Sequence, residues 1–458
     1  TGTGSWSPPA RRPRARDEPV DLTAALEYLQ GHVNLEATAG RIEGLSLDRI
    51  RAVLASLGDP QREVPVIHVT GTNGKGSTVR MASGLLQSLG LSVGTYTSPH
   101  LERLNERLAW GGRPVPDDVL AELIGDVARV EGVLDPSLGP PSYFEILTAA
   151  AFKWFADLAV DVAVVEVGLL GSHDATNAAD GRVAVITNVG RDHTDGGPGW
   201  RAAIAGEKAG IVKPGATLVL GETDPALAPV FEAAGAERVW RRDLDFGCLA
   251  NQLALGGRVV DLRTPGATYD QVFLALHGAH QGDNASAALT AAEAFVGRPL
   301  DEEVVTEALA DIAVPGRFEV VAHQPLVVID GAHNPDGASA LAATLEEGFA
   351  SAGRRHFIVG LLDGRDPVEM FRALGIGEED DLVVCTAASP RAVPASMLVA
   401  AAAELGLTAR GVDSVEAALA WVVDRSASDD VVVVAGSLYV VGAARRWRSR
   451  GNPAPAAC

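Results

Sequence analysis

The stretch "VIHVTGTNGKGSTVRMASGLL", residues 66–86, changes from an apolar run to a glycine-rich turn and then to an amphipathic pattern. This order predicts a strand, a loop and a helix. The N-terminus of a helix offers unpaired N–H groups and partial positive charge, and glycines let the backbone approach a ligand closely. Lys75 would reach the outer phosphates of a nucleotide, and the Ser77 hydroxyl would reach a magnesium ion. We therefore predict a phosphate-binding loop.

The spacing of this loop is a variant. Gly71 and Gly74 are separated by two residues, whereas the standard phosphate loop has four residues between its glycines. The alternative is a strand–helix turn with incidental glycines, which the lysine and the hydroxyl residues disfavour. We interpret His68, inside the strand, as a core histidine with satisfied hydrogen bonds.

Apolar strands alternate with helical patterns around this loop. The strand candidates are "VPVIHVT", "LSVGTYT", "DVAVVEVG", "RVAVITNVG" and "ATLVLG", and helices are expected at Ser77–Leu89, Phe144–Ala159 and Trp200–Ala209. Because the strands are continuously apolar, both of their faces should be covered, which indicates a mostly parallel sheet with helices on both sides. Residues 240–276 resemble short antiparallel strands, and residues 281–312 are helical in pattern.

A second α/β domain follows "AVPGR", where the Pro-Gly pair is typical of a linker. Beyond it the alternation restarts with "PLVVID", "RHFIVGLL", "DLVVCTA" and "DDVVVVAG". The expected divisions are a disordered leader at 1–19, a central domain at 20–312, a linker at 313–317, a C-terminal domain at 318–448 and a tail at 449–458.

Composition excludes several classes of protein. The formal net charge of −21 argues against nucleic acid or an anionic membrane as a partner, since both prefer a basic face. Runs such as "VAVVEV" are far shorter than the ~20 residues of a bilayer span. Cys248, Cys385 and Cys458 have no metal-type spacing, and residues 1–19 lack the apolar core of a signal peptide. We expect a cytoplasmic protein.

Polar residues stand at the ends of neighbouring strands, where parallel sheets bind ligands. They are Ser98, Glu166, Asn188, Asp192 and His193. A hydroxyl, a carboxylate and an imidazole at adjacent strand ends could complete a magnesium shell together with water and phosphate. Alternatively, Glu166 is a capped strand-end carboxylate and His193 bonds the backbone of its loop. Their joint placement around the phosphate loop favours the metal.

The second domain repeats this arrangement. "VVIDGAHNPDG" is a strand that ends at Asp330, a turn with His333 and Asn334, and a helix that begins at Pro335. Arg317 lies upstream at the junction of the domains. An arginine and a polar turn facing the phosphate loop would close over a nucleotide. The alternative for Arg317 is an ion pair at the domain interface.

Taken together, these motifs resemble those of the folylpolyglutamate synthase and dihydrofolate synthase family, within the Mur ligase superfamily of ATP-dependent amide ligases. They occur in the family's order from about residue 20 to residue 445. The matching segments are "HVTGTNGKGST", "TSPHL", "SYFEILTAAAF", "VVEVGLLG", "DATN", "ITNVGRDHT", "EKAGIVK", "HGAHQGDNASAAL", "GRFEVV", "DGAHNPDGA" and "AGSLYVVGAAR".

The resemblance implies a P-loop-type central ATPase domain and a C-terminal Rossmann-like domain, with ATP and substrates in the cleft between them. By this likeness the cofactor-binding residues are Thr72, Asn73, Gly74, Lys75, Gly76, Ser77, Asn284, Arg317 and Asp330. The likeness also implies that Ser98, Glu166 and His193 bind Mg²⁺ and that His333 lies near the transferred phosphate. Lys75, His333, Lys208 and Arg317 would be the catalytic residues.

Two further implications concern the acceptor and a modified lysine. The pterin side would be lined by Leu47, Arg49, Ser142, Tyr143, Phe144, Glu145 and Asp174. Lys208 matches a lysine that is carbamylated in such enzymes, and the alternative is an ordinary lysine in a salt bridge. The substrates would be ATP, L-glutamate and a pterin or folate, with room for a monovalent cation such as K⁺. We expect a monomer.

The chain departs from the family pattern at two loops. "GLLGSHDATN" places Ser172 and His173 where the family has an arginine, and "GRDHTDGGPGW" introduces Arg191. Three hypotheses therefore stand. The first is addition of glutamate to dihydropteroate or folate through an acyl phosphate formed from ATP. The second is the same chemistry on another acid, and the third is a nucleotide-binding module without ligase activity.

Overall fold

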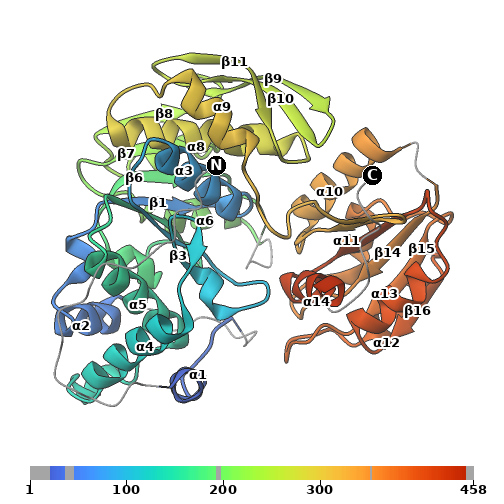
Figure 1. Ribbon diagram of the computed structural model, residues 1–458, viewed down its shortest axis with the longest axis horizontal. Helices are drawn as coiled ribbons and strands as arrows, with labels where there is room; N and C mark the ends of the chain where they lie inside the picture. Colours follow the sequence, from blue (N-terminus) through green and yellow to red (C-terminus); the bar gives the residue numbers. More distant parts are fainter. Residues whose placement is uncertain (1–20, 37–45, 192–196, 351–352, 450–458) are drawn as a thin grey trace, which may run out of the picture.

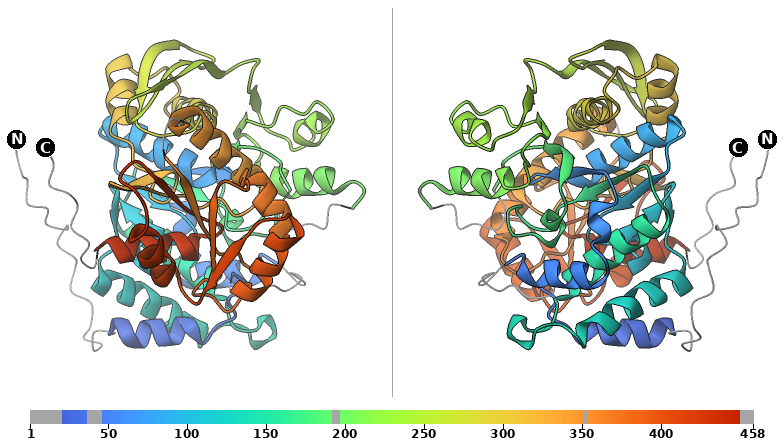
Figure 2. Two further views of the ribbon diagram at one scale, coloured as in Figure 1. Left: turned by 90° about the vertical axis from the view of Figure 1, so that its right-hand side faces the viewer. Right: turned by 90° about the vertical axis from the view of Figure 1, so that its left-hand side faces the viewer.

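The computed structural model describes residues 21–36, 46–191, 197–350 and 353–449, which form two α/β domains (Figure 1). The central domain runs from blue to yellow, and the C-terminal domain is orange to red. Seen from the C-terminal side, the orange and red sheet lies in front of the central domain (Figure 2, left). The expected leader, 1–19, and the expected tail from residue 450 onward lie outside the described residues.

The main sheet of the central domain has the strand order β4-β3-β2-β5-β1-β6-β7-β8. The bounds are β1 Val66–Thr70, β2 Val93–Tyr96, β3 Leu108–Trp110, β4 Arg113–Pro114, β5 Val162–Glu166, β6 Gly181–Ile186, β7 Thr217–Leu220 and β8 Arg238–Arg241. All pairings from β2 to β8 are parallel, and β3 and β4 are antiparallel. The mostly parallel sheet and its five expected strands are confirmed. The strands β3 and β4 went unpredicted because they are too short to show a period.

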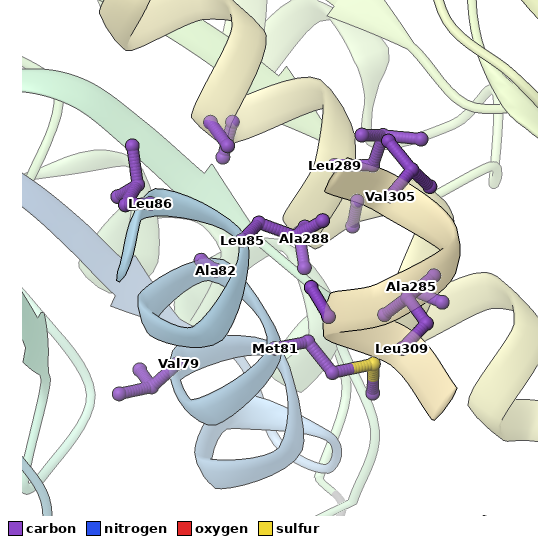
Figure 3. Packing of buried hydrophobic residues seen from close by; sticks show 14 of the residues in the cluster. Val79, Met81, Ala82, Leu85, Leu86, Ala285, Ala288, Leu289, Val305 and Leu309 are labelled. Atoms are coloured by element: carbon purple, nitrogen blue, oxygen red, sulfur yellow. The ribbon is translucent and has the colours of Figure 1, made fainter. Parts of the chain in front are cut away.

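Helices cover both faces of this sheet. On one face α3 packs against α8 and α9 through buried apolar side chains (Figure 3). On the other face lie α1, α2, α4 and α5, and the pair α6 and α7 flanks β6 to β8. The α-helix bounds are α1 Leu22–Gln30, α2 Asp48–Ser56, α3 Lys75–Ser88, α4 Asp117–Glu131, α5 Tyr143–Asp157, α6 Trp200–Ala209, α7 Ala228–Glu232, α8 His280–Val296 and α9 Glu302–Ala310. Short 3₁₀ turns are η1 Pro60–Arg62, η2 Leu104–Arg107, η3 Pro136–Leu138 and η4 Ala175–Ala178.

The side chains of strand β1 pack into different apolar clusters on the two faces of the sheet. Ile67 and Val69 belong to the apolar cluster that includes α3, whereas Val66 belongs to the cluster on the opposite face. This alternation follows from the two-residue period of a strand. The helix α3 begins at Lys75, two residues before the expected start, because Gly74 is its N-cap in a left-handed conformation with φ 82°.

The expected antiparallel appendage is a three-stranded sheet of order β11-β10-β9. Its strands are β9 Gly247–Ala254, β10 Gly257–Arg263 and β11 Thr268–Leu274. Arg258 of β10 is buried and forms a bidentate ion pair with Glu347 of the C-terminal domain, at 2.7 and 2.9 Å. The appendage therefore joins the two domains.

The C-terminal domain is a six-stranded sheet of order β12-β13-β17-β14-β15-β16, in which the β12–β13 pairing is antiparallel and the others are parallel. The strands are β12 Glu319–His323, β13 Leu326–Ile329, β14 Arg355–Val359, β15 Asp381–Cys385, β16 Ala409–Val412 and β17 Val431–Ala435. The helices α10 Pro335–Phe349, α11 Pro367–Ala373 and α12 Ala395–Glu404 cover one face, and α13 Val415–Val423 and α14 Leu438–Ser449 cover the other. This is the expected Rossmann-like layering.

Candidate active site

The phosphate loop connects β1 to α3 and is shaped by two glycines. Gly71 has φ 153° and Gly74 has φ 82°. A Cβ at Gly71 would lie 1.8 Å from the Thr187 hydroxyl, and one at Gly74 would lie 2.3 Å from Asn284 Oδ1. Both positions therefore require glycine on steric grounds.

The end of β6 holds the loop in place. The Thr187 hydroxyl donates to the carbonyl oxygen of Asn73 at 2.6 Å, and the backbone N–H of Asn73 donates to Asn188 Oδ1 at 3.0 Å. Lys75 Nζ folds back on the loop and donates to the carbonyl oxygens of Gly71 and Thr72 at 3.0 and 3.2 Å. Asn188, a candidate ligand in the sequence, thus acts as a brace for the loop. Thr187 was missed because a hydroxyl at a strand end has no distinctive pattern.

Glu166 ends β5 beside this loop and is 5% exposed. Its Oε2 accepts the backbone N–H of Ser98 at 3.2 Å. Burial raises the pKa of the Glu166 carboxyl, against the opposing charges of Lys75, Arg317 and Arg80. A buried carboxylate next to the Ser77 and Ser98 hydroxyls is an oxygen-rich donor set, which fits a divalent cation that keeps water and phosphate ligands. The third expected ligand, His193, lies outside the described residues, as does Asp192.

The C-terminal domain presents the opposite wall. Asn334 is the N-cap of α10: its Oδ1 accepts the Gly337 N–H at 2.8 Å, and its Nδ2 donates to Asn73 Oδ1 at 3.0 Å. The N-terminus of a helix therefore points at the phosphate loop of the other domain. The sequence placed Asn334 in a polar turn expected to face the phosphate loop but not as a helix cap, although Asn followed by Pro at a helix start is a capping signal.

Asp330 and His333 are both fixed by the backbone of the turn between β13 and α10. The two carboxylate oxygens of Asp330 accept the N–H groups of Phe318 and Ala332, each at 2.7 Å. Burial raises the pKa of Asp330, and the Arg317 charge opposes this. Nδ1 of His333 lies 2.8 Å from the carbonyl oxygen of Gly331, which makes it the donor nitrogen of the neutral ring.

A cleft of about 1370 Å³ lies between these walls and is lined by both domains. Most of the residues predicted from sequence line it together. They are Arg49, Thr72, Asn73, Gly74, Lys75, Gly76, Ser77, Ser98, Ser142, Phe144, Glu145, Glu166, Asp174, Asn284, Arg317, Asp330 and His333. Leu47 and Tyr143 instead belong to the apolar core behind the acceptor wall.

The acceptor wall, the side of the cleft where Arg49, Ser142 and Glu145 lie, includes the start of helix α5. Ser142 and Glu145 form a capping box at the start of α5, in which each side chain accepts a backbone N–H of the other residue. Glu145 also accepts from Arg49 Nε at 2.7 Å. Arg49 and Glu145 are therefore paired with each other at this wall.

Lys208 is buried in α6 behind the phosphate loop. A separate small cavity of about 20 Å³ lies between Lys208 and Lys75, and the segment Gly168–Leu170 forms its third side. This volume is about that of one small molecule such as water. Two lysines therefore line one small space.

The two departures from the family pattern also face the cleft. The Ser172 hydroxyl donates to the carbonyl oxygen of Glu207 at 3.1 Å, and His173 Nδ1 lies 3.8 Å from the Glu207 carboxylate. Arg191 pairs with Glu369 of the C-terminal domain at 3.1 Å, so it bridges the two domains.

Comparison with known proteins defines the class first. Residues 141–292 match the model of the Mur ligase middle domain, and residues 316–438 match that of the Mur ligase, glutamate ligase domain. The fold and the two-walled cleft are accordingly those of a Mur-type C–N ligase.

Individual relatives narrow the class. The chain is 39% identical over 438 residues to the dihydrofolate synthase/folylpolyglutamate synthase of Mycobacterium tuberculosis, covering 87% of this chain and 89% of that protein. It is 34% identical to the folylpolyglutamate synthase of Lacticaseibacillus casei, covering 93% and 98%. The chain belongs to the folylpolyglutamate synthase and dihydrofolate synthase family.

Solved structures agree. A Mycobacterium tuberculosis folylpolyglutamate synthase complexed with ADP and AMPPCP superposes with a TM-score of 0.87 at 36% identity, covering 94% of this chain and 100% of that one. A bifunctional enzyme of this family from Yersinia pestis, complexed with AMPPNP and a Mn ion, gives a TM-score of 0.79 at 30% identity, covering 94% and 98%. Within the described ranges, no helix is long and apolar enough to cross a bilayer.

Proposed function

We propose that this chain uses ATP to join L-glutamate to dihydropteroate, to the glutamate tail of a folate, or to both, in the cleft between its two domains. The observation that carries the proposal is the contact of Asn334 with Asn73, because it brings the N-terminus of α10 against the phosphate loop. Two helix N-termini, those of α3 and α10, then approach one triphosphate from opposite sides.

The reaction must activate a carboxylate, since its oxygen cannot leave as oxide. The γ-phosphoryl group of ATP is transferred to the acid to form an acyl phosphate and ADP. The amino group of glutamate then attacks the acyl carbon, an amide bond forms and inorganic phosphate leaves. These reaction steps require no nucleophile from a side chain of the protein.

Lys75 and Arg317 are proposed to neutralise charge on the transferring phosphoryl group. The carbonyl oxygens of Gly71 and Thr72 take two of the three N–H donors of Lys75, so the third can serve a phosphate oxygen. His333 and Asp330 complete the opposite wall, with Asn284 next to Gly74 of the loop. Glu166 and Ser98, with His193 beyond the described ranges, would hold Mg²⁺, which would supply further positive charge at the phosphates.

Lys208 is proposed to carry a carbamate. Its burial beside a small cavity that Lys75 also lines supports this, because a carbamate would bring a negative charge to the cavity that the Lys75 ammonium shares. A ¹³C-labelled bicarbonate NMR signal that disappears in Lys208→Met would support the modification, and an unchanged spectrum would exclude it. Stimulation of turnover by K⁺ over Na⁺ tests the proposed monovalent cation. A monomeric state and a cytoplasmic location belong to the same proposal.

The acceptor is proposed to lie against Arg49, Ser142, Phe144, Glu145 and Asp174. A second candidate, ligation of glutamate to a different acid, rests on His173 and Arg191, which give this wall and the cleft mouth charges that differ from the family pattern. Binding of nucleotide without ligation is disfavoured by the cleft's full set of Lys75, Glu166 and Arg317.

The test is phosphate release from ATP with glutamate plus dihydropteroate, plus tetrahydrofolate, plus an unrelated aromatic acid, or with no acceptor. Turnover with either pterin acid, together with a product larger by one glutamate, supports the proposal. Turnover with the unrelated acid alone supports the second candidate. No turnover with any acceptor, while ATP still binds, would overturn ligation.

A further inference from the structure

A buried polar chain connects the centre of β1 to the acceptor wall. His68 Nε2 lies 2.8 Å from the Thr176 hydroxyl of η4, and this hydroxyl donates to Asp174 Oδ1. His68 and Thr176 are completely buried, and Asp174 is 6% exposed at the edge of the cleft. The expectation that His68 is a fully satisfied core histidine is wrong, because its Nδ1 is buried without a hydrogen-bond partner among the described atoms.

The missing hydrogen-bond partner of His68 Nδ1 fixes the donor and acceptor roles in the series His68, Thr176 and Asp174. A threonine hydroxyl has one proton, and here it is donated to Asp174, so the hydroxyl accepts from His68 Nε2–H. The reverse arrangement would place a proton on His68 Nδ1, where a buried N–H would have no acceptor and would cost free energy. The hydrogen bonds from His68 to Thr176 and from Thr176 to Asp174 are therefore both donated in the direction of Asp174. These bonds favour the ionised form of the Asp174 carboxyl.

Asp174 in turn holds the segment that follows β5. Its Oδ2 accepts the backbone N–H of Leu169 at 2.8 Å, and its Oδ1 accepts that of Thr176 at 3.0 Å. On the same face of β1, the Thr70 hydroxyl donates to the carbonyl oxygen of Leu170 at 2.6 Å. Gly168–Leu170 is thus tied to β1 directly through Thr70 and indirectly through Asp174, Thr176 and His68.

This segment has two functional faces. Gly168, Leu169 and Leu170 line the large cleft and also form one side of the small cavity between Lys75 and Lys208. A carboxylate has about four lone-pair sites, and three donors of the same protein occupy Asp174: the N–H groups of Leu169 and Thr176 and the Thr176 hydroxyl. Asp174 is therefore built to shape the wall and has little capacity left to bond a substrate directly.

We propose that His68 and Thr176 are positioning residues for ligation: they keep Asp174 as an anionic brace that holds Gly168–Leu170 in the shape that receives the acceptor acid. This inference rests on the proposed function, because it concerns the acceptor side of the same cleft. It assigns a role to a strand residue that touches neither nucleotide loop nor solvent.

The titratable neighbours make Asp174 the group that responds near neutral pH. Burial raises the pKa of Asp174 to about 6, and the hydrogen bonds from Thr176 and Leu169 oppose the rise. Burial and the facing Lys213 charge hold the pKa of His68 at about 3, so His68 stays neutral. Tyr96 of β2 also faces Asp174, and burial raises its pKa far above the working range. The brace is therefore lost as the pH falls through about 6.

The test compares Thr176→Val with Thr176→Ser. Valine removes the hydroxyl at nearly constant volume, and serine keeps it. We measure kcat/KM for the acceptor acid and KM for ATP from pH 5.5 to 8.5. Because the lost bond favoured the charged form, the acid limb in Thr176→Val should move up by about one pH unit, which is roughly a fivefold loss at pH 6 and approaches about tenfold at lower pH. Thr176→Ser should retain the wild-type profile, and KM for ATP should change little in both variants.

Several results would overturn the inference. A wild-type pH profile in Thr176→Val, an equal loss in Thr176→Ser, or a loss confined to KM for ATP would each do so. If Thr176→Val does not fold, His68→Gln, which keeps a donor at the Nε2 position, and His68→Leu, which removes it, take its place. The acid limb should then shift in His68→Leu alone, and an equal effect in both would count against the chain.

A readout without turnover separates this inference from the proposed function. With ¹³C-aspartate labelling, the Asp174 carboxyl should titrate near pH 6 in the wild type and higher in Thr176→Val. If no pterin acid is ligated but this shift is seen, the proposed function fails while the brace stands. If the wild type ligates and the shift is absent, the brace fails alone.

Discussion

Asn334 performs two separable tasks, and replacing it with alanine or serine should separate them. Its Oδ1 caps α10 through the Gly337 N–H, and its Nδ2 reaches Asn73 of the phosphate loop at 3.0 Å. Asn334→Ala loses both bonds. The cap contributes about 1 kcal/mol, and the bridge, as a single hydrogen bond, contributes about 1 kcal/mol more. We therefore expect a destabilisation of about 2 kcal/mol.

Asn334→Ser keeps the cap, because serine is a strong N-cap residue, but its shorter side chain cannot span the distance to Asn73. Its unfolding free energy should lie within about 1 kcal/mol of wild type. Its kcat/KM for ATP should still fall about fivefold, the factor that corresponds to 1 kcal/mol. Urea unfolding followed by tryptophan fluorescence and glutamate-dependent phosphate release measure the two effects.

The matched control is Ser414, the N-cap of α13 in the same domain, whose side chain accepts the Ala417 N–H at 3.1 Å. Ser414 is absent from the cleft lining, so Ser414→Ala should lose about 1 kcal/mol of stability and no activity. If Asn334→Ser ligates at the wild-type rate, the bridge does not hold the two walls together, and the reasoning about facing helix ends is wrong.

Three further outcomes are expected. Lys75→Ala should abolish ATP-dependent amide formation and leave the circular dichroism spectrum and urea midpoint near wild type; ligation at the wild-type rate would refute the phosphate-loop assignment. Arg258→Ala should cost about 2 kcal/mol in urea unfolding because it removes the charge-assisted hydrogen bonds of a buried guanidinium to the exposed Glu347 carboxylate, whereas Arg263→Ala on the same strand, where Arg263 donates to backbone carbonyls at an exposed site, should cost under ~1 kcal/mol. Burial holds the pKa of His68 at about 3, below its ordinary value of 6.5, so as the pH drops from 6.5 toward 3 the unfolded protein binds a proton that the native protein does not, and the free energy of unfolding falls. Between pH 7 and pH 5, His68→Gln should therefore lose about 2 kcal/mol less unfolding free energy than the wild type. An equal loss in both proteins would contradict this.

The strands were predictable because they are buried on both faces. Runs such as Val162–Val165 and Val431–Ala435 are apolar throughout, and this pattern occurs where helices cover both sides of a parallel sheet. The polar residues after those strands were predictable as a group for the same reason, since the carboxyl ends of parallel strands meet at one edge. The loop glycines and Lys75 then located the nucleotide within that edge.

Pairings between distant segments were not predictable. Asn73 and Asn334 are 261 positions apart, and neither residue type indicates a partner. Leu47 and Tyr143 were expected at the acceptor wall, and they pack behind it because a helix places only some of its first-turn residues on the cleft side. Local pattern gives the element on which a residue lies, whereas its direction depends on packing that the pattern does not contain.

His68 shows where the strand argument stops. Within "VIHVT" the histidine interrupts an apolar run, and the simplest interpretation is a polar residue tolerated in the core. In the structure, the even-numbered side of β1 carries Val66, His68 and Thr70 toward the crossover segment, and the odd-numbered side carries Ile67 and Val69 toward α3. One face of the strand thus holds the helix that follows the phosphate loop, and the other holds the wall beside Lys208. A buried polar residue on a strand that ends at a phosphate loop is therefore evidence about the neighbouring loop, because its burial is tolerated only when that loop supplies the hydrogen bond.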